Sequence, residues 1–355
     1  MAKVTFRGVR IRGVAGAVPS ARVDNLRDHT FVPEEDRKKI VALTGVKGYR
    51  KAPTGVCTSD LCHSAAEKLL DHLAVPREDV DGLVFATMTP DYVTPSTACV
   101  LQDRLGLPQS VVAYDVNMGC SGFIVGLYNA CCMIAGAGLR RVLVLSGDTQ
   151  TKLCHAEDKN VVFIMGDAGT ATVVESAPES EQIVMELRTD GRRFRSLYVP
   201  AGGCRVPSSA ATREVTKRAD GSSRSDDDIY MDGMEIFKFA ATDVVKTIAD
   251  FMEGEGLNAE NVDTLFLHQA NQFMNDKIAR KLGFEGSQLP YTIQSYGNTG
   301  AASIPLTIAS HLAGLASREA RHRSVMSGFG IGLSWGVATA DLGGTLALPI
   351  SEVDS

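Results

Sequence analysis

The sequence has 355 residues and a net charge of −6, with 44% hydrophobic and 22% charged residues, which is typical of a globular protein large enough for two domain-sized halves. This charge does not favour nucleic acid or an anionic membrane surface as a partner. No apolar run approaches the roughly 18 residues of a spanning helix, and residues 1–12 alternate like a strand, so we expect a cytoplasmic protein.

The first half of the chain alternates buried strands with helices. Residues 80–87 (VDGLVFAT) and 111–116 (VVAYDV) read as strands, and residues 122–136 follow as a mostly apolar helix. Two more strands are expected at 141–146 and 170–174. This order predicts an α/β fold.

The same order recurs in the second half. Residues 262–267 (VDTLFL) resemble 80–85, and residues 297–312 form a glycine-containing turn followed by an apolar helix. Residues 323–327 and 335–342 supply the closing strands. Four matches in order predict an internal duplication, with halves at 1–177 and 178–355.

Two further segments lie in the second half. Residues 202–228 are polar and rich in serine and charge, which indicates a long loop or an edge excursion. Helical periodicity resumes over residues 232–250.

Cys120 is the main candidate nucleophile. In residues 115–123 (DVNMGCSGF) a strand ends, a glycine turn follows, and Cys120 stands where a helix begins. The positive end of a helix dipole and its free N–H groups should lower the pKa of this thiol. The alternative is a small buried apolar thiol, but a strand–turn–helix setting favours the nucleophile.

The other seven cysteines suggest neither a disulfide framework nor a metal site. They are scattered through a chain that we expect to be cytoplasmic, where thiols stay reduced. The groups Cys57, Cys62 and His63, or Cys154 and His155, do not have a known zinc spacing. We therefore expect no metal.

His268 and Asn298 are the expected partners of Cys120. His268 follows an apolar strand in LFLHQAN, where a side chain can project into a cleft, although a structural histidine is the alternative. Asn298 lies in SYGNTGAAS, at the turn that corresponds to the Cys120 turn in the duplication. Paired halves would bring these two turns together. The glycine-rich segment 328–336 (GFGIGLSWG) could supply a backbone N–H to an oxyanion hole.

These motifs together resemble the β-ketoacyl-[acyl-carrier-protein] synthase III family. The resemblance rests on five segments, in this order: VNMGCSGF, IMGDAGTA (164–171), LHQAN, YGNTGAASIP and GFGIGLSWG. It implies a five-layered α-β-α-β-α thiolase fold built from two similar halves, and a homodimer. The implied activity is a decarboxylative Claisen condensation of an acyl thioester with malonyl-acyl carrier protein, without a metal or redox cofactor.

The resemblance also implies a role for each site residue. Cys120 matches the acylated nucleophile, and His268 and Asn298 match the pair that assists decarboxylation. The backbone N–H groups of Cys120 and Ile331 match the oxyanion hole. Asn271 matches a residue beside the pantetheine arm.

The chain departs from the family pattern on the side where coenzyme A binds. Lys39 and Leu43 replace a tryptophan and an arginine, Phe273 replaces an arginine, and Lys159 replaces another. A carrier-protein thioester or another coenzyme A pose is therefore expected. Thr94 stands where the family often carries a large aromatic residue that crosses the dimer, which predicts an acyl group larger than acetyl.

Three other functions remain as alternatives. The chain could transfer the Cys120 acyl group to an oxygen or nitrogen nucleophile, or serve as a non-catalytic partner subunit. It could also be a thiolase, but thiolases use a second cysteine in the C-terminal glycine loop, and residues 328–336 contain none.

Overall fold

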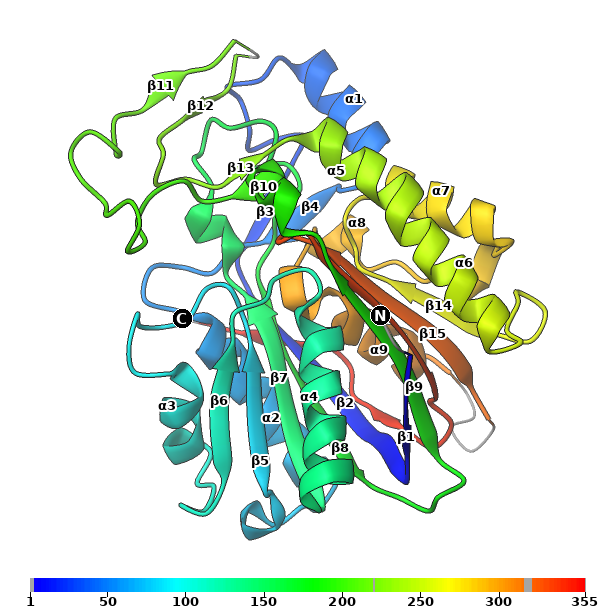
Figure 1. Ribbon diagram of the computed structural model, residues 1–355. Coiled ribbons are helices and arrows are strands. Elements are labelled where there is room, and N and C mark those ends of the chain that lie inside the picture. The colour runs from blue at the N-terminus through cyan, green and yellow to red at the C-terminus, as the bar shows by residue number, and fades with distance from the viewer. Residues whose placement is uncertain (1–2, 220, 316–320, 355) are drawn as a thin grey trace.

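The computed structural model describes residues 3–219, 221–315 and 321–354. Two β-sheets lie roughly face to face, with helices between them and on both outer sides (Figure 1). The strands of the first sheet run in the order β17-β2-β8-β7-β5-β6, and β18 also pairs with β2. Their bounds are β2 (Val9–Pro19), β5 (Gly82–Ala86), β6 (Val112–Val116), β7 (Arg141–Asp148), β8 (Ala168–Ser176), β17 (Leu346–Ala347) and β18 (Ser351–Val353).

The second sheet has the order β1-β9-β16-β15-β14. Its strands are β1 (Val4–Arg7), β9 (Gln182–Thr189), β14 (Thr264–Leu267), β15 (Arg323–Gly330) and β16 (Ser334–Asp341). Its pairing repeats that of the first sheet: β14 is parallel to β15 and β15 antiparallel to β16, as β5 is parallel to β7 and β7 antiparallel to β8.

The helices form three layers. The central layer holds α4 (Gly122–Ala137) and α9 (Ser303–Ala313), whose apolar side chains pack against both sheets. A helix covered on both sides is expected to be apolar all round, which is how the sequence of α4 reads. The outer layers are α2 (Thr58–His72) with α3 (Thr97–Arg104), and α5 (Gly233–Phe239) with α6 (Val245–Gly254) and α7 (Gln272–Leu282). The predicted five-layered thiolase-like fold is confirmed.

The duplication extends to individual hydrogen bonds. In the first half, the N–H of Asp81 donates to the carbonyl of Arg141 (2.9 Å), and the Asp81 carboxylate accepts from the N–H of Arg141 (3.1 Å). In the second half, Asp263 and Arg323 make the same two bonds, at 2.8 and 2.7 Å. The aspartates of the two VD motifs therefore occupy equivalent places.

The two halves are interlocked at their ends. Strand β1 joins the second sheet through β9, whereas β17 and β18 join the first sheet through β2. Residues 177 and 178 lie in the connection from β8 to β9. The division into 1–177 and 178–355 remains a prediction.

The described residues of the polar segment 202–228 are mainly irregular, as expected, and include a short antiparallel pair, β11 (Thr216–Lys217) with β12 (Ser223–Arg224). A second short pair, β10 (Leu197–Tyr198) with β13 (Tyr230–Met231), joins the two flanks of the segment. The remaining α-helices and strands of the described residues are α1 (Glu34–Thr44), α8 (Ile293–Tyr296), β3 (Arg22–Asp24) and β4 (Gly48–Arg50). A π-helical segment, η4 (Ala240–Val244), joins α5 to α6, and the short 3-10 helices are η1 (Arg77–Asp79), η2 (Gln150–Leu153), η3 (Gly191–Ser196), η5 (Gly286–Gln288) and η6 (Gly300–Ala302). Among the described helices, none has the length and apolar character to cross a membrane.

Candidate active site

Cys120 lies in the turn between β6 and α4, two residues before the helix begins. The glycine loop of the second half packs directly against it. A Cβ atom on Gly330 would lie 2.6 Å from the Cβ and 2.7 Å from the Sγ of Cys120, so only glycine fits there. The hydroxyls of Ser121 and Ser334 lie 2.6 Å apart and link the Cys120 turn to the end of the glycine loop.

The predicted lowering of the Cys120 pKa is wrong. Burial raises the pKa of this thiol to about 11, because the surrounding protein cannot solvate a thiolate. The backbone N–H groups of Ile331 and of Cys120 itself act in the opposite direction. These are the two N–H groups predicted to form the oxyanion hole. The resting site therefore holds a neutral thiol.

His268 follows the C-terminal end of β14 and is 1% exposed. Its Nδ1 lies 2.7 Å from the hydroxyl of Ser303, at the start of α9. Burial lowers the pKa of His268 to about 3, so the ring is neutral at neutral pH. A serine hydroxyl can donate or accept, so this partner stabilises either neutral tautomer.

Asn298 presents its amide N–H₂ to the cavity. Its Oδ1 accepts a hydrogen bond from the N–H of Gly300 (3.0 Å), which leaves Nδ2 on the other side of the amide. Its own N–H donates to the carbonyl of Ile164 (2.8 Å), and its carbonyl accepts from the N–H of Gly166 (2.8 Å). The IMGDAGTA motif therefore holds the Asn298 turn in place.

Asp148, at the end of β7, connects the two halves below the site. Its buried carboxylate accepts from the N–H groups of Met88 and Ala301, each at 2.8 Å, and from the Thr87 hydroxyl at 3.1 Å. Burial raises the pKa of Asp148 to about 7. Gly300 must be glycine, since a Cβ there would lie 2.1 Å from the Asp148 carboxylate.

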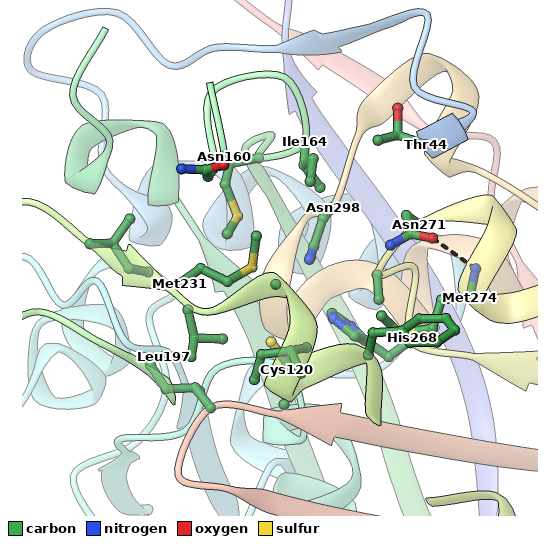
Figure 2. Close-up of a pocket in the computed structure, with 18 of the residues that line it drawn as sticks. Thr44, Cys120, Asn160, Ile164, Leu197, Met231, His268, Asn271, Met274 and Asn298 are labelled. Atoms are coloured by element: carbon green, nitrogen blue, oxygen red, sulfur yellow. Dashed lines mark hydrogen bonds between the residues drawn. The ribbon is translucent and has the colours of Figure 1, made fainter. Parts of the chain in front are cut away.

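Cys120, His268 and Asn298 line one cavity of about 500 Å³ (Figure 2). Ile331, Asn271 and Phe273 line it as well, so the structure brings together six of the seven predicted site residues. Asn271 caps α7 and accepts a hydrogen bond from the N–H of Met274 (2.7 Å) (Figure 2).

Phe273 lies at the mouth of this cavity and is 40% exposed. Its ring stacks on Phe237 at 5.8 Å, and the Lys277 ammonium lies 4.8 Å from the ring centroid of Phe273. The seventh residue, Thr94, lies elsewhere, on an exposed loop outside the lining of this cavity. Its expected role depends on a second chain and stays a prediction.

Three residues that the sequence motifs did not indicate, Ser303, Asp148 and Gln150, contact the site residues. The Ser303 hydroxyl contacts His268, and the Gln150 side-chain amide donates to the carbonyl of Asn298. The Asp148 carboxylate of the first half accepts a hydrogen bond from the N–H of Ala301 in the second half. Asp148 and Gln150 could have been found as polar residues at and just after the end of an apolar strand. Nothing local distinguishes Ser303 from other helix-start serines.

Comparisons with known proteins agree with this geometry. The sequence profile described as 3-oxoacyl-[acyl-carrier-protein (ACP)] synthase III matches residues 114–191, and its C-terminal counterpart matches residues 252–342. A β-ketoacyl-[acyl-carrier-protein] synthase III from Lactococcus lactis subsp. lactis is 33% identical over 335 residues, covering 94% of this chain and 99% of the relative. The chain belongs to the β-ketoacyl-[acyl-carrier-protein] synthase III family.

Solved structures lead to the same family. A 3-oxoacyl-(acyl-carrier protein) synthase from Burkholderia xenovorans superposes with a TM-score of 0.91 at 34% identity, covering 99% of both chains. The priming β-ketosynthase of the R1128 polyketide pathway superposes with a TM-score of 0.78 at 24% identity, over 95% of this chain and 97% of that one, and supports the fold alone.

Proposed function

We propose that the chain is a condensing acyltransferase that carries an acyl group on Cys120 and joins it to a malonyl unit with loss of CO₂. One observation carries the proposal: a thiol, a neutral imidazole and an amide N–H₂ converge on one cavity, beside a backbone N–H directed at the sulfur. Family membership supports it. The product is a β-ketoacyl thioester for fatty acid or specialised lipid and polyketide synthesis.

The first half-reaction acylates Cys120. An acyl thioester enters the cavity, the sulfur attacks its carbonyl carbon, and the thiol proton leaves with the carrier thiol. The N–H groups of Cys120 and Ile331 stabilise the oxyanion, an interaction worth about 2.7–4 kcal/mol per donor in comparable sites. Because the resting thiol has a raised pKa, its proton must be transferred as the substrate binds.

The second half-reaction forms the carbon–carbon bond. A malonyl thioester binds with its carbonyl oxygen facing His268 Nε2 and Asn298 Nδ2. These donors stabilise the enolate that remains when CO₂ leaves. The enolate carbon then attacks the acyl-cysteine carbonyl, the C–S bond breaks, and the Cys120 thiolate recovers a proton. The chemistry uses only side chains and backbone N–H groups, so we expect it to need no metal or redox cofactor.

Intact-protein mass spectrometry after incubation with acyl thioesters tests the first half-reaction. We expect one acyl mass on Cys120 and none on a Cys120→Ala variant. Labelled malonyl thioester then tests the second, by release of labelled CO₂ and formation of a β-ketoacyl product. Normal condensation by the alanine variant would contradict the proposal.

The alternative functions have different signatures. Acyl transfer to an oxygen or nitrogen nucleophile would consume the acyl-enzyme without CO₂ release, and it gives no role to the Asn298 amide. A non-catalytic subunit would not acquire the acyl mass. A thiolase would condense two acyl thioesters without a malonyl donor.

We infer the acyl donor from the residues at the mouth of the cavity. Leu43, Met234 and Phe273 are exposed there, at 58%, 63% and 40%, and present an apolar rim. This apolar rim favours a carrier protein as the acyl or malonyl donor. It favours less a coenzyme A molecule held by the tryptophan and arginine residues that the family carries on this side. Because Thr94 stands where the family often has a large aromatic residue, we also expect carrier-bound butyryl to octanoyl primers to be turned over faster than acetyl. Equal rates would contradict this expectation.

We also propose a homodimer. Strand β6 forms one edge of the first sheet, pairs only with β5 among the described strands, and carries the half-exposed Val112. Val93, fully exposed beside Thr94, lies on the loop that follows β5. An exposed edge of this kind is normally covered. Light scattering of the purified chain tests this, and a monomer would contradict it. The cytoplasmic location stays a prediction.

A further inference from the structure

The lining of the catalytic cavity divides into an exposed mouth and a buried inner wall. The inner wall is mainly apolar: Met165, Leu197, Ile229, Ile236 and Phe329 are all less than a tenth exposed. Gln150, two residues after the end of β7, is also part of this lining and is 1% exposed. It places an amide in a largely apolar wall.

The hydrogen bonds of Gln150 determine which way its amide faces. Its Nε2 donates to the carbonyl of Asn298 and to the carbonyl of Gly166 (3.4 Å). Because both partners are acceptors, the nitrogen must be on that side and the oxygen on the other. Among the described residues, the Gln150 Oε1 atom has no hydrogen-bond partner. It is also not one of the fully buried side-chain oxygen and nitrogen atoms that lack a partner elsewhere in the described protein.

Thr44 provides the contrast within the same cavity. It is also a buried polar lining residue, but its hydroxyl donates to the carbonyl of Ile40 (2.8 Å) and accepts from the N–H of Val46 (3.3 Å). Its hydrogen-bonding capacity is used within the protein. The Gln150 oxygen is left as an acceptor that a ligand in the cavity can reach.

We propose that Gln150 selects an acyl primer that carries a hydroxyl group on its chain. The inference rests on the proposed function and names the substrate class of the same site. The hydroxyl donates to Gln150 Oε1, while the rest of the acyl chain lies against the apolar wall. The pantetheine arm is a less suitable donor, because we expect it to pass Asn271 and the exposed Phe273 at the mouth of the cavity.

The expected selectivity follows from the cost of an unpaired buried acceptor. A primer without the hydroxyl displaces water from Oε1 and gives no hydrogen bond in return. A site that hydrogen-bonds a substrate hydroxyl discriminates strongly against the analogue that lacks it. For one neutral hydrogen bond we expect about a 10- to 100-fold preference in kcat/KM for acylation.

The experiment compares hexanoyl thioester with its straight-chain monohydroxy isomers, all on the same carrier. Acylation of Cys120 in the full-length protein is followed by intact-protein mass spectrometry. At least one isomer should react about 10-fold faster than hexanoyl, or more. In Gln150→Leu this ratio should fall to about one, because leucine has no acceptor.

Gln150→Leu also loses the two hydrogen bonds that its Nε2 donates to the carbonyls of Asn298 and Gly166. We expect this loss to slow all primers alike, so it does not by itself change the ratio between the hydroxylated primer and hexanoyl. Gln150→Met keeps the length of the side chain and replaces the leucine variant if that one fails to fold. Thr44→Val is the matched control and should keep the wild-type ratio. Absence of a preferred isomer, or a preference that survives in the Gln150 variants, overturns the proposal. Absence of any acyl adduct on Cys120 overturns the proposed function as well.

Discussion

The two turns that meet at the cavity come from equivalent places in the two halves, yet they carry different chemistry. The first turn holds a thiol, and the second holds a side-chain amide whose N–H₂ faces the cavity. The neighbouring strand pairs of the two halves are built alike, down to the paired bonds of Asp81 with Arg141 and of Asp263 with Arg323. A duplicated scaffold therefore brings two turns together, and divergence of the turns divides the reaction between them.

The scaffold also ties the turns to each other. Asp148 of the first half accepts the N–H of Ala301 in the second, and Gly330 of the second half packs on Cys120 of the first. The comparison predicts that the Cys120 turn governs acyl transfer and the Asn298 turn governs decarboxylation. Four measurements can break or sharpen it.

The largest effect is expected for Cys120→Ala. Condensation should fall by at least about 10⁴-fold, because no acyl-enzyme can form. Decarboxylation of the malonyl thioester should persist, since His268 and Asn298 remain. The measurement is β-ketoacyl product beside labelled CO₂. Loss of both activities in a folded variant would show that the two turns do not act separately.

Asn298→Ala should produce the complementary result. Removal of one enolate donor should lower the condensation rate by about 10²–10³-fold. Formation of the acyl-enzyme on Cys120 should stay within a few-fold of wild type, as followed by mass spectrometry. Asn298→Asp serves as a shape-matched control and should be equally slow in condensation. A matching loss in the acylation step would contradict the division of roles.

The pH dependence of Cys120 alkylation tests the environment of the first turn. Burial raises the pKa of Cys120 to about 11, so the reactive thiolate becomes more populated as pH rises toward that value. The iodoacetamide rate should therefore climb by about tenfold per pH unit, without a plateau by about pH 9. Peptide-level mass spectrometry separates Cys120 from the exposed Cys99 and Cys204. A plateau near neutral pH would restore the helix-dipole expectation.

The smallest effects are expected for Asp81→Ala and Asp263→Ala. Each removes a carboxylate that accepts backbone N–H groups at the start of equivalent strands. We expect the free energy of unfolding to fall by about 1 kcal/mol in each, and somewhat more for Asp81, which accepts two N–H groups. Chemical denaturation measures both. An effect in one half alone would show that the hydrogen bonds are equivalent in geometry but not in energy.

Much of the fold was predictable because it rests on local pattern. The strands at β5, β6, β7, β8 and β14 to β16 read as apolar runs, and α4 and α9 read as helices after glycine turns. Their repeated order was enough to predict the duplication. The exchange of β1 and β17 between the sheets was not predictable, since two- to four-residue strands carry almost no periodic signal.

The sequence by itself determined that Cys120, His268 and Asn298 belong together, because each stands at a strand end or turn that the duplication makes equivalent or adjacent. Only the tertiary structure decided their chemical state. Whether Cys120 rests as a thiol, which way the amides of Asn298 and Gln150 face, and that Ser303 lies against His268 all depend on burial and on hydrogen bonds between segments far apart in the chain. Desolvation and long-range hydrogen bonds have no local sequence signature, and for Cys120 desolvation outweighs the two backbone N–H groups that lower its pKa.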